Sequence, residues 1–529
     1  MKGNMNNIRE LIELRASESG DKTCLVFGDE EITYRHLNQR VNQVAIGLDR
    51  MGIRKSDRVA LLLENIPEFI YFWWGILKLG AVMVPINLRL TSREVAYIIN
   101  HSEARVVVLG EPSLHILSDL RGDCAGVEQF LGVRLGHSHG LKTIDDFHNS
   151  STGLKPVEIS MEDNAVILYT SGTTGFPKGV VHTQGNYLRT AASFVRTCDL
   201  KSTDRLITAN PLFHVNAQFY SAMGTLLAGS TLILARKFSA SGFWDWTRKY
   251  RANKAVMLLA LTTILYNRPT RPDDADNPVD LVIAGGAPKG HYRDFERRFN
   301  VMLQTLYSLT EAPLSVMGPL HEDCVDGAVG IPMLSGYPGQ DNEVKVFDAS
   351  DHELPPDRTG QIVIRNQAMM KTYFKDPEGT ASAIKDGWLQ TGDKGRRDQH
   401  GWLYFLGRTK DVIRKKGENI SAVEVETALT AHASVAETAV IGVTPSDAAG
   451  EEEIMAFVVW GSAQSRPWDH LIAHCEAGLA DFKVPRFWLS VDTLPKNSLN
   501  RVVKHMLKQT GVPEEIAGTY DRLKNEVRS

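Results

Sequence analysis

Short apolar runs rich in β-branched residues alternate with longer amphipathic segments, and this alternation limits the possible folds more than any other feature of the chain. Between residues 58 and 110 the sequence reads RVALLL, IPEFIYFWWGILKLG, AVMVPIN, REVAYIINHSE and ARVVVLG in this order. Further apolar runs lie at 165–169, 230–235, 255–261 and 279–284. Strands that alternate with helices form mainly parallel sheets covered by helices. We therefore expect an α/β fold of layered parallel sheets.

The chain is long enough for at least two domains, because 529 residues exceed what one hydrophobic core usually organises. The composition changes near Gly407, where GRTKDVIRKKGENIS carries five basic residues. In the next segment Ser421 and Glu424 have the spacing of a helix capping box, and apolar runs at 436–443 and 454–460 predict strands. We expect a large N-terminal domain at 1–406, a connection at 407–411 and a small α+β domain at 412–529.

Two segments have an unusual composition. RPTRPDDADNP at 268–278 is rich in proline and aspartate, so we expect an exposed loop. FIYFWWGILKLGAVMVPI at 69–86 is apolar enough to suggest a membrane span. However, Lys78 lies in its middle, Gly80 interrupts it and Pro85 ends it, and an unpaired lysine at mid-bilayer is costly. We therefore expect a buried helix followed by a buried strand, with no transmembrane segment.

Charge and cysteine content favour a small-molecule partner in a reducing compartment. The formal net charge is −4, which gives no general reason to expect nucleic acid or an anionic membrane. The five cysteines are widely spread without a CxxC motif, which indicates reduced thiols and no structural zinc. The N-terminal segment lacks the apolar stretch of a signal peptide, so we expect a cytoplasmic protein.

The segment YTSGTTGFPKGV at 169–180 follows the apolar run AVIL and combines hydroxyls, glycines and a lysine. Backbone N–H groups, hydroxyls and an ammonium after a strand are typical of a phosphate-binding loop. The segment is not a Walker A motif, because no serine or threonine follows Lys178. A structural glycine-rich turn remains the alternative for this segment alone.

Three further segments carry groups suited to a nucleotide. AGGAP at 284–288 ends an apolar run, and its small residues would let a flat ring lie against the backbone. In YSLTEAP at 307–313, Thr310 can donate to a phosphate oxygen and Glu311 can hold Mg²⁺. TGD at 391–393 ends in a carboxylate that can accept from ribose hydroxyls. Each segment alone is also compatible with an ordinary turn.

Together and in this order, these segments resemble the acyl-adenylate-forming superfamily, which includes acyl-CoA synthetases, adenylation domains of peptide synthetases and luciferases. The resemblance covers nearly the whole chain and extends to PLFHVN at 211–216, GRTKDVIRKKGENIS at 407–421 and FKVPR at 482–486. Within the superfamily, the segment HVNAQFYSAMGTLLAGSTLILARKFSASGFW and the segment RKKGENISAVEVE look most like the crotonobetaine/carnitine–CoA ligase branch.

The resemblance implies a reaction in two steps with ATP, Mg²⁺ and coenzyme A. A carboxylate attacks the α-phosphate of ATP and expels pyrophosphate, and the thiol of CoA then displaces AMP from the acyl-adenylate. The first step gathers negative charge on phosphoryl oxygens, so it needs cations and donors more than covalent chemistry. In this family the small mobile C-terminal domain rotates between the two steps, and a homodimer is common among relatives.

The resemblance also implies roles for individual residues. The implied nucleotide-binding residues are Thr170, Ser171, Gly172, Thr173, Thr174, Gly175, Lys178, Gly285, Gly286, Ala287, Tyr307, Asp393 and Arg408. The implied catalytic residues are His214, Thr310, Glu311, which also holds the metal, and Arg501. The implied acyl-binding residues are His214, Asn216, Gln218, Phe219, Leu261 and Thr262, of which Phe219 could offer an aromatic face to a quaternary ammonium. Lys410 is the implied hinge, and Lys416, Gly417 and Glu418 match the loop that forms the channel for CoA.

The chain departs from the family near its C-terminus. Relatives usually carry L-P-x-T-x-x-G-K, whose lysine bridges substrate and phosphate oxygens, whereas this chain reads LPKNSLNRVVKHML. Asn500 stands where the glycine is expected and Arg501 where the lysine is expected. Arginine keeps the charge but is broader and planar. Either Arg501 does the work of the lysine, or Lys504 or Lys496 reaches in, or adenylation is slow; we favour the first.

These observations predict an AMP-forming carboxylate–CoA ligase for a small-molecule acid, short or betaine-like. Two alternatives stay open from the sequence. The enzyme could pass the acyl group to an amine or a carrier protein instead of CoA. The chain could also be a catalytically weak adenylate-binding protein, because Arg501 replaces the usual lysine.

Overall fold

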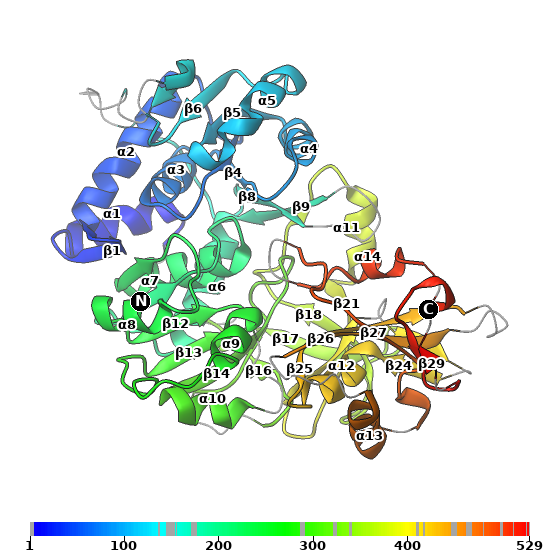
Figure 1. The fold of residues 1–529 in the computed structure, drawn as a ribbon. Helices are drawn as coiled ribbons and strands as arrows, with labels where there is room; N and C mark the ends of the chain where they lie inside the picture. Colours follow the sequence, from blue (N-terminus) through cyan, green and yellow to red (C-terminus); the bar gives the residue numbers. More distant parts are fainter. Residues whose placement is uncertain are drawn as a thin grey trace.

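The computed structural model describes residues 5–527 with gaps, and Figure 1 shows its arrangement, with the C-terminal elements in orange and red to one side of the larger N-terminal part. Outside the described residues lie 1–4, 136–137, 144–145, 147–153, 155, 171–176, 286–290, 321–324, 338–340, 409–411, 416–417, 446–451, 462–467, 480, 498–500, 512, 525 and 528–529. For residues 138, 259, 260, 412, 414, 418, 419, 514 and 526 only the backbone is described.

The first sheet has the strand order β19-β9-β8-β4-β3-β5-β6-β7 and is parallel from β8 to β7. Its strands are β3 (Arg58–Leu62), β4 (Val82–Pro85), β5 (Ala104–Leu109), β6 (Gln129–Gly132), β7 (Lys142–Thr143), β8 (Asn164–Thr170), β9 (Lys178–Thr183) and β19 (Thr372–Tyr373). The helices of this region are α2 (Tyr34–Arg50), α3 (Pro67–Lys78), α4 (Ser92–Ser102), the 3₁₀ turn η1 (Glu111–Ile116) and α5 (Leu117–Asp123). The predicted α/β alternation is therefore confirmed here.

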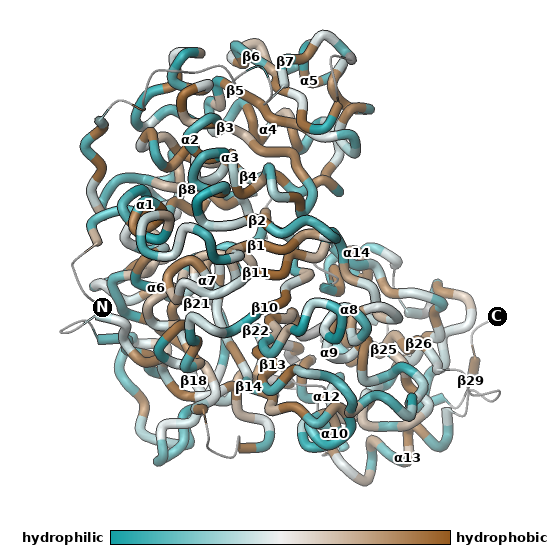
Figure 2. Tube along the Cα trace, turned by 90° about the vertical axis from the view of Figure 1, so that its left-hand side faces the viewer, coloured by the Kyte–Doolittle hydropathy of each residue, from teal (hydrophilic) through white to brown (hydrophobic). Residues whose placement is uncertain are grey.

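The second sheet has the order β16-β15-β14-β13-β12-β10-β11-β1-β2, with parallel pairing from β14 to β1. Its strands are β1 (Thr23–Phe27), β2 (Glu30–Thr33), β10 (Arg205–Thr208), β11 (Thr231–Leu234), β12 (Lys254–Met257), β13 (Leu281–Ala284), β14 (Met302–Tyr307), β15 (Val316–Met317) and β16 (Ile331–Pro332). Its helices are α1 (Ile8–Glu18), α6 (Gln184–Thr197), the π-helix η4 (Asn216–Ala222), α7 (Met223–Ala228), α8 (Phe243–Tyr250), α9 (Leu259–Tyr266) and α10 (Tyr292–Phe299). In Figure 2 the strands β1 and β11 are brown and apolar, whereas α10 is largely teal.

A third sheet is antiparallel and carries part of the site. It contains β17 (Glu343–Phe347), β18 (Gly360–Arg365), β20 (Ile384–Lys385), β21 (Trp388–Arg397) and β22 (Leu403–Arg408), and α11 (Pro377–Ala383) precedes β20. β21 and β22 form a hairpin in which Asp393 lies opposite Arg408. Two candidate nucleotide-binding residues, 15 positions apart in the sequence, are thereby brought side by side.

The C-terminal part is α+β, as the sequence predicts. It contains β23 (Val412–Lys415), β24 (Glu418–Ser421), α12 (Ala422–Thr430), β25 (Val435–Val443), β26 (Glu453–Trp460), α13 (Trp468–Gly478), β27 (Phe487–Ser490), α14 (Lys504–Lys508), β28 (Tyr520–Asp521) and β29 (Glu526–Val527). Ser421 caps α12 by accepting from the backbone N–H of Glu424, as the capping-box spacing predicts. The Glu424 carboxylate instead accepts from Lys483 at 2.6 Å.

The apolar stretch 69–86 forms a buried helix and a buried strand, as expected. Pro67 occupies the first turn of α3, and Gly80 with φ of 67° ends it, since a left-handed residue breaks the helix. Lys78 is fully buried, and its ammonium donates to Glu13, Asn38 and Asn42 at 3.2, 2.6 and 2.8 Å. Among the described residues no helix is long and apolar enough to cross a membrane.

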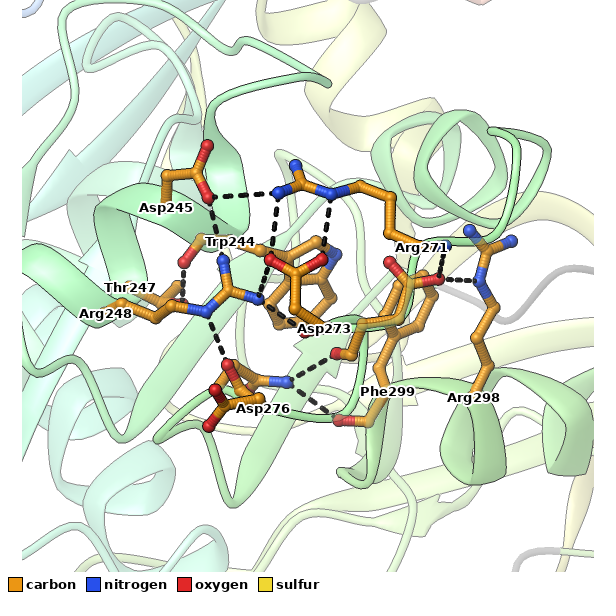
Figure 3. Close-up of polar contacts among 11 residues, drawn as sticks. Trp244, Asp245, Thr247, Arg248, Arg271, Asp273, Asp276, Arg298 and Phe299 are labelled. Atoms are coloured by element: carbon orange, nitrogen blue, oxygen red, sulfur yellow. Dashed lines mark hydrogen bonds and ion pairs between the residues drawn. The ribbon is translucent and has the colours of Figure 1, made fainter.

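The structure corrects one expectation about local structure and confirms another except at one residue. The apolar run 255–261 is not one strand, because β12 ends at Met257 and α9 begins at Leu259; a short apolar run does not distinguish the two elements. The segment 268–278 is a mostly exposed loop, but Asp274 within it is buried and pairs with Arg298 at 2.7 Å. Figure 3 shows how arginines of α8 and α10 hold this loop through its aspartates.

Candidate active site

The candidate phosphate loop connects two paired strands. β8 ends at Thr170, which lies opposite Lys178 at the start of the antiparallel strand β9. The loop between them falls outside the described residues, and with it the predicted phosphate ligands Ser171, Gly172, Thr173, Thr174 and Gly175. The pairing of β8 with β9 thus fixes both ends of the loop, and Lys178 is the first residue of β9.

Lys178 is held by the segment that follows β19. Its ammonium lies 3.1 Å from Oδ2 of Asp376 and 4.8 Å from the ring centroid of Tyr373. Lys178 and Asp376 are both exposed, each with more than a third of its side-chain surface accessible. The backbone N–H of Gly379 and the Lys178 ammonium lower the pKa of Asp376 below its ordinary value, so the carboxylate is ionised. A phosphate group that binds Lys178 therefore competes with this carboxylate.

Glu311 lies in the turn after β14 and is tied to the same segment. The Tyr373 hydroxyl donates to Oε1 of Glu311 at 2.9 Å, and the backbone N–H of Met370 donates to the Glu311 carbonyl at 2.7 Å. A carboxylate has about four lone-pair positions, so one hydrogen bond orients it without saturating it. Glu311 is half-buried and is the carboxylate that the sequence nominates for a metal ion.

His182, which the sequence did not nominate, fixes the neighbouring Thr310. Asn186 donates to Nδ1 of His182 at 2.9 Å, so Nε2 carries the proton and donates to the Thr310 carbonyl at 2.7 Å. Burial lowers the pKa of His182 to about 4, and the ring is neutral near pH 7. Its place on β9, four residues after Lys178, is the only sequence signal that could have pointed to it.

Asp393 has an unfilled acceptor in a buried position. Its Oδ2 accepts from the Tyr307 hydroxyl at 2.8 Å. Its Oδ1 lies 3.4 Å from Nε of Arg408 and has no hydrogen-bond partner among the described residues. Burial raises the pKa of Asp393 above its ordinary value, and Arg408 and Tyr307 oppose that shift. A buried acceptor without a donor fits a hydroxyl-bearing ligand such as a ribose.

Arg501 of the C-terminal part interacts electrostatically with candidate residues of the large domain. Burial, followed by the Arg501 cation, lowers the pKa of His214 to about 3. Burial, followed by the Arg408 cation, lowers the pKa of Arg501, while Asp393 raises it. Arg501 is exposed in the structure. The structure therefore brings Arg501 within electrostatic reach of His214, Arg408 and Asp393.

Two hydrogen bonds join Arg501 to Asn497. The Arg501 N–H donates to the side chain of Asn497 at 2.9 Å, and the Asn497 N–H donates to the Arg501 carbonyl at 2.8 Å. Lys496 is bound to Glu437 at 2.6 Å, and Lys504 lies 2.8 Å from Oε1 of Glu426. Both lysines thus have counter-ions within the C-terminal part.

The predicted acyl-binding residues are mostly occupied by protein partners. Gln218 and Phe219 are fully buried in η4; Gln218 accepts from the Tyr187 hydroxyl, and Phe219 stacks on Tyr187 with centroids 4.2 Å apart. Phe219 also meets His182 edge-on, so it offers no open face to an ammonium group. This corrects the expectation that Phe219 is available to a substrate cation. The correction arises because the sequence could not tell a pocket aromatic from a core aromatic.

The other acyl candidates differ in exposure. Asn216 is buried and accepts from Asn210 at 2.6 Å, and its backbone N–H donates to Nδ1 of His214 at 3.3 Å. Thr262 is fully buried and Leu261 half-buried, both in α9. The π-helical geometry of η4 is a feature that frequently marks functional sites. Asn216 therefore connects the His214 ring to Asn210, which also donates to the Val256 carbonyl of β12.

The remaining candidates are described only in part or lie outside the described residues. Gly285 is exposed directly after β13, and its N–H donates to Met257 at 3.2 Å. For Glu418 only the backbone is described, paired with Lys415 in the β23–β24 hairpin. The predictions for Gly286, Ala287, Lys410, Lys416 and Gly417 fall outside the described residues.

Comparison with known families gives two matches that together span most of the chain. The family described as AMP-binding enzyme matches residues 12–374, and the family described as AMP-binding enzyme C-terminal domain matches residues 424–500. Among curated proteins, the crotonobetaine/carnitine–CoA ligases of Salmonella typhimurium (strain LT2) and Salmonella agona are each 34% identical over 518 residues. In both cases the match covers 95% of this chain and 99% of the relative.

Solved structures give the same fold over nearly the full length. The anthranilate–CoA ligase AuaEII in complex with anthranoyl-AMP is similar with a TM-score of 0.87 and 24% identity, covering 95% of this chain and 96% of that one. ATP-bound MatB from Rhodopseudomonas palustris is similar with a TM-score of 0.85 and 28% identity, covering 96% and 99%. The layered sheets and the smaller C-terminal part are shared with these proteins.

Proposed function

Since the chain belongs to the AMP-binding enzyme family, we propose that it is an AMP-forming carboxylate–CoA ligase that activates a small or betaine-like acid. Family enzymes of this type use ATP and CoA. The acid attacks the α-phosphate of ATP, pyrophosphate leaves, and the CoA thiol then takes the acyl group from the adenylate. The length shared with crotonobetaine/carnitine–CoA ligases supports both the reaction and the class of acid.

The observation that carries the proposal is the position of Arg501 against His214, Arg408 and Asp393. Adenylation gathers negative charge on the carboxylate and on phosphoryl oxygens, and a cation aimed at that charge lowers the barrier. Desolvation and the Arg408 charge disfavour the Arg501 cation in the absence of an anion. An anionic substrate supplies the missing counter-charge, so Arg501 is suited to the role that a lysine has in relatives.

The other lysines are less suited to that role. Lys496 and Lys504 would each have to leave a glutamate at 2.6 and 2.8 Å before they could reach the large domain. Breaking either ion pair leaves an uncompensated carboxylate within the C-terminal part. This cost favours Arg501 over the second reading, in which one of these lysines replaces it.

The nucleotide has partners on several elements. The unpaired Oδ1 of Asp393 would accept from a ribose hydroxyl, with Tyr307 holding the other oxygen. Lys178, released from Asp376, would bind the outer phosphates, and Thr310 would lie near the α-phosphate. Among the described residues no group of three or more His, Cys, Asp or Glu could hold a metal. This fits Mg²⁺, which usually binds one or two carboxylates together with substrate phosphates, so Glu311 would be its protein ligand.

Mg²⁺ would neutralise developing charge on the phosphates when bound. The chain's own groups have the remaining roles. His182 holds Thr310, Tyr373 holds Glu311, and Arg501 would stabilise negative charge on the acid carboxylate and the phosphoryl oxygens. We also propose that the connection at 407–411 with Lys410 is a hinge, and that the Gly417 loop forms the CoA channel. A homodimer is proposed on the same family grounds.

The test is carboxylate-dependent ATP–pyrophosphate exchange without CoA, across acetate, crotonobetaine, carnitine, long-chain acids and aryl acids. We expect exchange with one class of acid and CoA-thioester formation after CoA is added. If exchange occurs but the acyl group is transferred only to an amine or a carrier protein, CoA is not the acceptor. No exchange with any acid, while adenylates still bind, would favour the adenylate-binding alternative motivated by Arg501.

A further inference from the structure

A short segment between β18 and β20 joins two parts of the site that lie far apart in the sequence. Lys178 precedes this segment by nearly two hundred residues, and Glu311 by about sixty. Strand β19 pairs antiparallel with β9, so that Tyr373 lies opposite Val180 and Thr372 opposite Val181. Figure 1 shows the outcome, with α11 beside the end of β9. The segment 370–376 is therefore held against β9, whose first residue is Lys178.

Tyr373 contacts both candidate groups at once. Its hydroxyl donates to Oε1 of Glu311 at 2.9 Å, and its ring centroid lies 4.8 Å from the Lys178 ammonium. A tyrosine hydroxyl keeps its proton near pH 7, so it donates to the Glu311 carboxylate. The hydroxyl therefore contacts the Glu311 carboxylate, and the ring contacts the Lys178 ammonium.

The backbone of Tyr373 is itself tightly held. Its N–H donates to the Thr380 hydroxyl at 2.9 Å, and that hydroxyl donates to the Asp376 carbonyl at 2.7 Å. On either side, the N–H of Lys371 donates to Val181 at 2.9 Å and the N–H of Phe374 donates to Gly179 at 2.7 Å. The ring is therefore carried by a backbone with little freedom, which is what a group that positions others requires.

We propose that Tyr373 is a positioning residue that couples the metal-binding carboxylate to the phosphate-binding lysine. The hydroxyl holds Glu311 in one orientation, so that the remaining lone pairs of the carboxylate meet Mg²⁺ without prior reordering. The ring attracts the Lys178 ammonium and keeps it beside the phosphate loop once ATP displaces Asp376. This inference rests on the proposed function, because it assigns a role within the same ATP site.

The test separates the hydroxyl from the ring. ATP affinity is measured by calorimetry without acid or CoA, first in EDTA and then across a Mg²⁺ titration. Tyr373→Phe removes only the hydroxyl, so we expect ATP affinity in EDTA within about twofold of wild type, while the Mg²⁺ concentration for half-maximal tightening rises about threefold to tenfold. Tyr373→Leu also removes the ring, so we expect weaker ATP binding in EDTA as well.

Tyr404 provides a matched control. Its hydroxyl donates to the Asp398 carboxylate at 3.2 Å, and the Arg396 guanidinium lies 3.7 Å from its ring centroid. Tyr404 thus also contacts one carboxylate and one cation, but at the other end of the β21–β22 hairpin from Arg408. Tyr404→Phe should change neither ATP affinity nor the Mg²⁺ requirement. A loss in Tyr373→Phe that is equal in EDTA and in Mg²⁺ would indicate a merely structural role and overturn the proposal.

Failure of the proposal and failure of the proposed function give different results. If wild type binds ATP with a Mg²⁺ requirement and Tyr373→Phe matches it in both conditions, only the role of Tyr373 is overturned. If wild type binds no ATP in either condition, the proposed function is overturned, and the role of Tyr373 falls with it. Thermal denaturation of each variant checks that the fold is intact.

Discussion

Arg501 is the residue whose replacement tests the chemistry most directly. At about 4 Å and an effective dielectric constant of about 20, a charge pair is worth roughly 4 kcal/mol. Repulsion from Arg408 opposes that gain until an anionic substrate is present. Removing one donor aimed at developing charge typically costs about 3–4 kcal/mol of transition-state stabilisation. Arg501→Ala should therefore lower carboxylate-dependent ATP–pyrophosphate exchange by about 10²–10³-fold, whereas Arg501→Lys should keep most of it.

Two further measurements show where in the reaction Arg501 acts. Conversion of a preformed acyl-adenylate by CoA should stay within about threefold of wild type in Arg501→Ala, because the charge is needed in the first step. The Arg501 cation also helps to lower the pKa of His214, so the pKa of that imidazole, followed by NMR, should rise in Arg501→Ala. The NMR readout does not depend on turnover.

Lys496→Met and Lys504→Met are the controls for the competing interpretation. Both lysines are bound to glutamates of the C-terminal part, so exchange in these variants should stay within about threefold of wild type. The reasoning is refuted if Arg501→Ala exchanges at the wild-type rate, or if either lysine variant loses as much exchange as Arg501→Ala.

Three other perturbations have expected outcomes. Asp376→Asn removes the charge that competes for Lys178, so ATP binding measured by calorimetry should tighten up to about fivefold, the worth of an exposed ion pair; weaker binding would contradict this. Arg298→Ala leaves the buried Asp274 carboxylate without its ion pair, so the free energy of unfolding in urea should fall by about 3 kcal/mol, and an unchanged midpoint would refute it. Burial lowers the pKa of Lys78 from 10.5 to about 8 in the folded protein. Above about pH 8 the unfolded chain therefore binds one proton more than the folded protein, and the free energy of unfolding should rise by about 2–3 kcal/mol by about pH 10 relative to Lys78→Met. Parallel pH profiles of the free energy of unfolding in the two proteins would exclude this.

The sequence predicted the layers, the C-terminal α+β part and the groups at the carboxyl ends of the strands. These features follow from local patterns: the β-branched runs at 58–62 and 104–109 are read within a few residues, and Ser421 caps its helix through a bond to a residue three positions away. The replacement of a lysine by Arg501 could also be read directly. Local patterns suffice here because the interactions that form these elements are themselves local.

Contacts between residues that are far apart in the sequence could be identified only from the tertiary structure. Phe219 was nominated for a substrate, yet it is stacked in the core, and Asp274 was expected in an exposed loop, yet it is buried beside Arg298. Neither burial nor stacking is visible in the residue types, because an apolar or charged side chain is compatible with both surroundings.

His182 and Tyr373 show the same limit at the site itself. The bond from His182 to Thr310 spans 128 residues, and the bond from Tyr373 to Glu311 spans 62. Both exist only because β9 pairs with β8 on one side and β19 on the other, and because β14 ends beside them. The sequence by itself nominated most of the chemical groups of the candidate site, but not His182 or Tyr373. The order of strands in the sheets decided which of those groups touch, since side chains distant along the chain meet only where the backbone pairing brings them together.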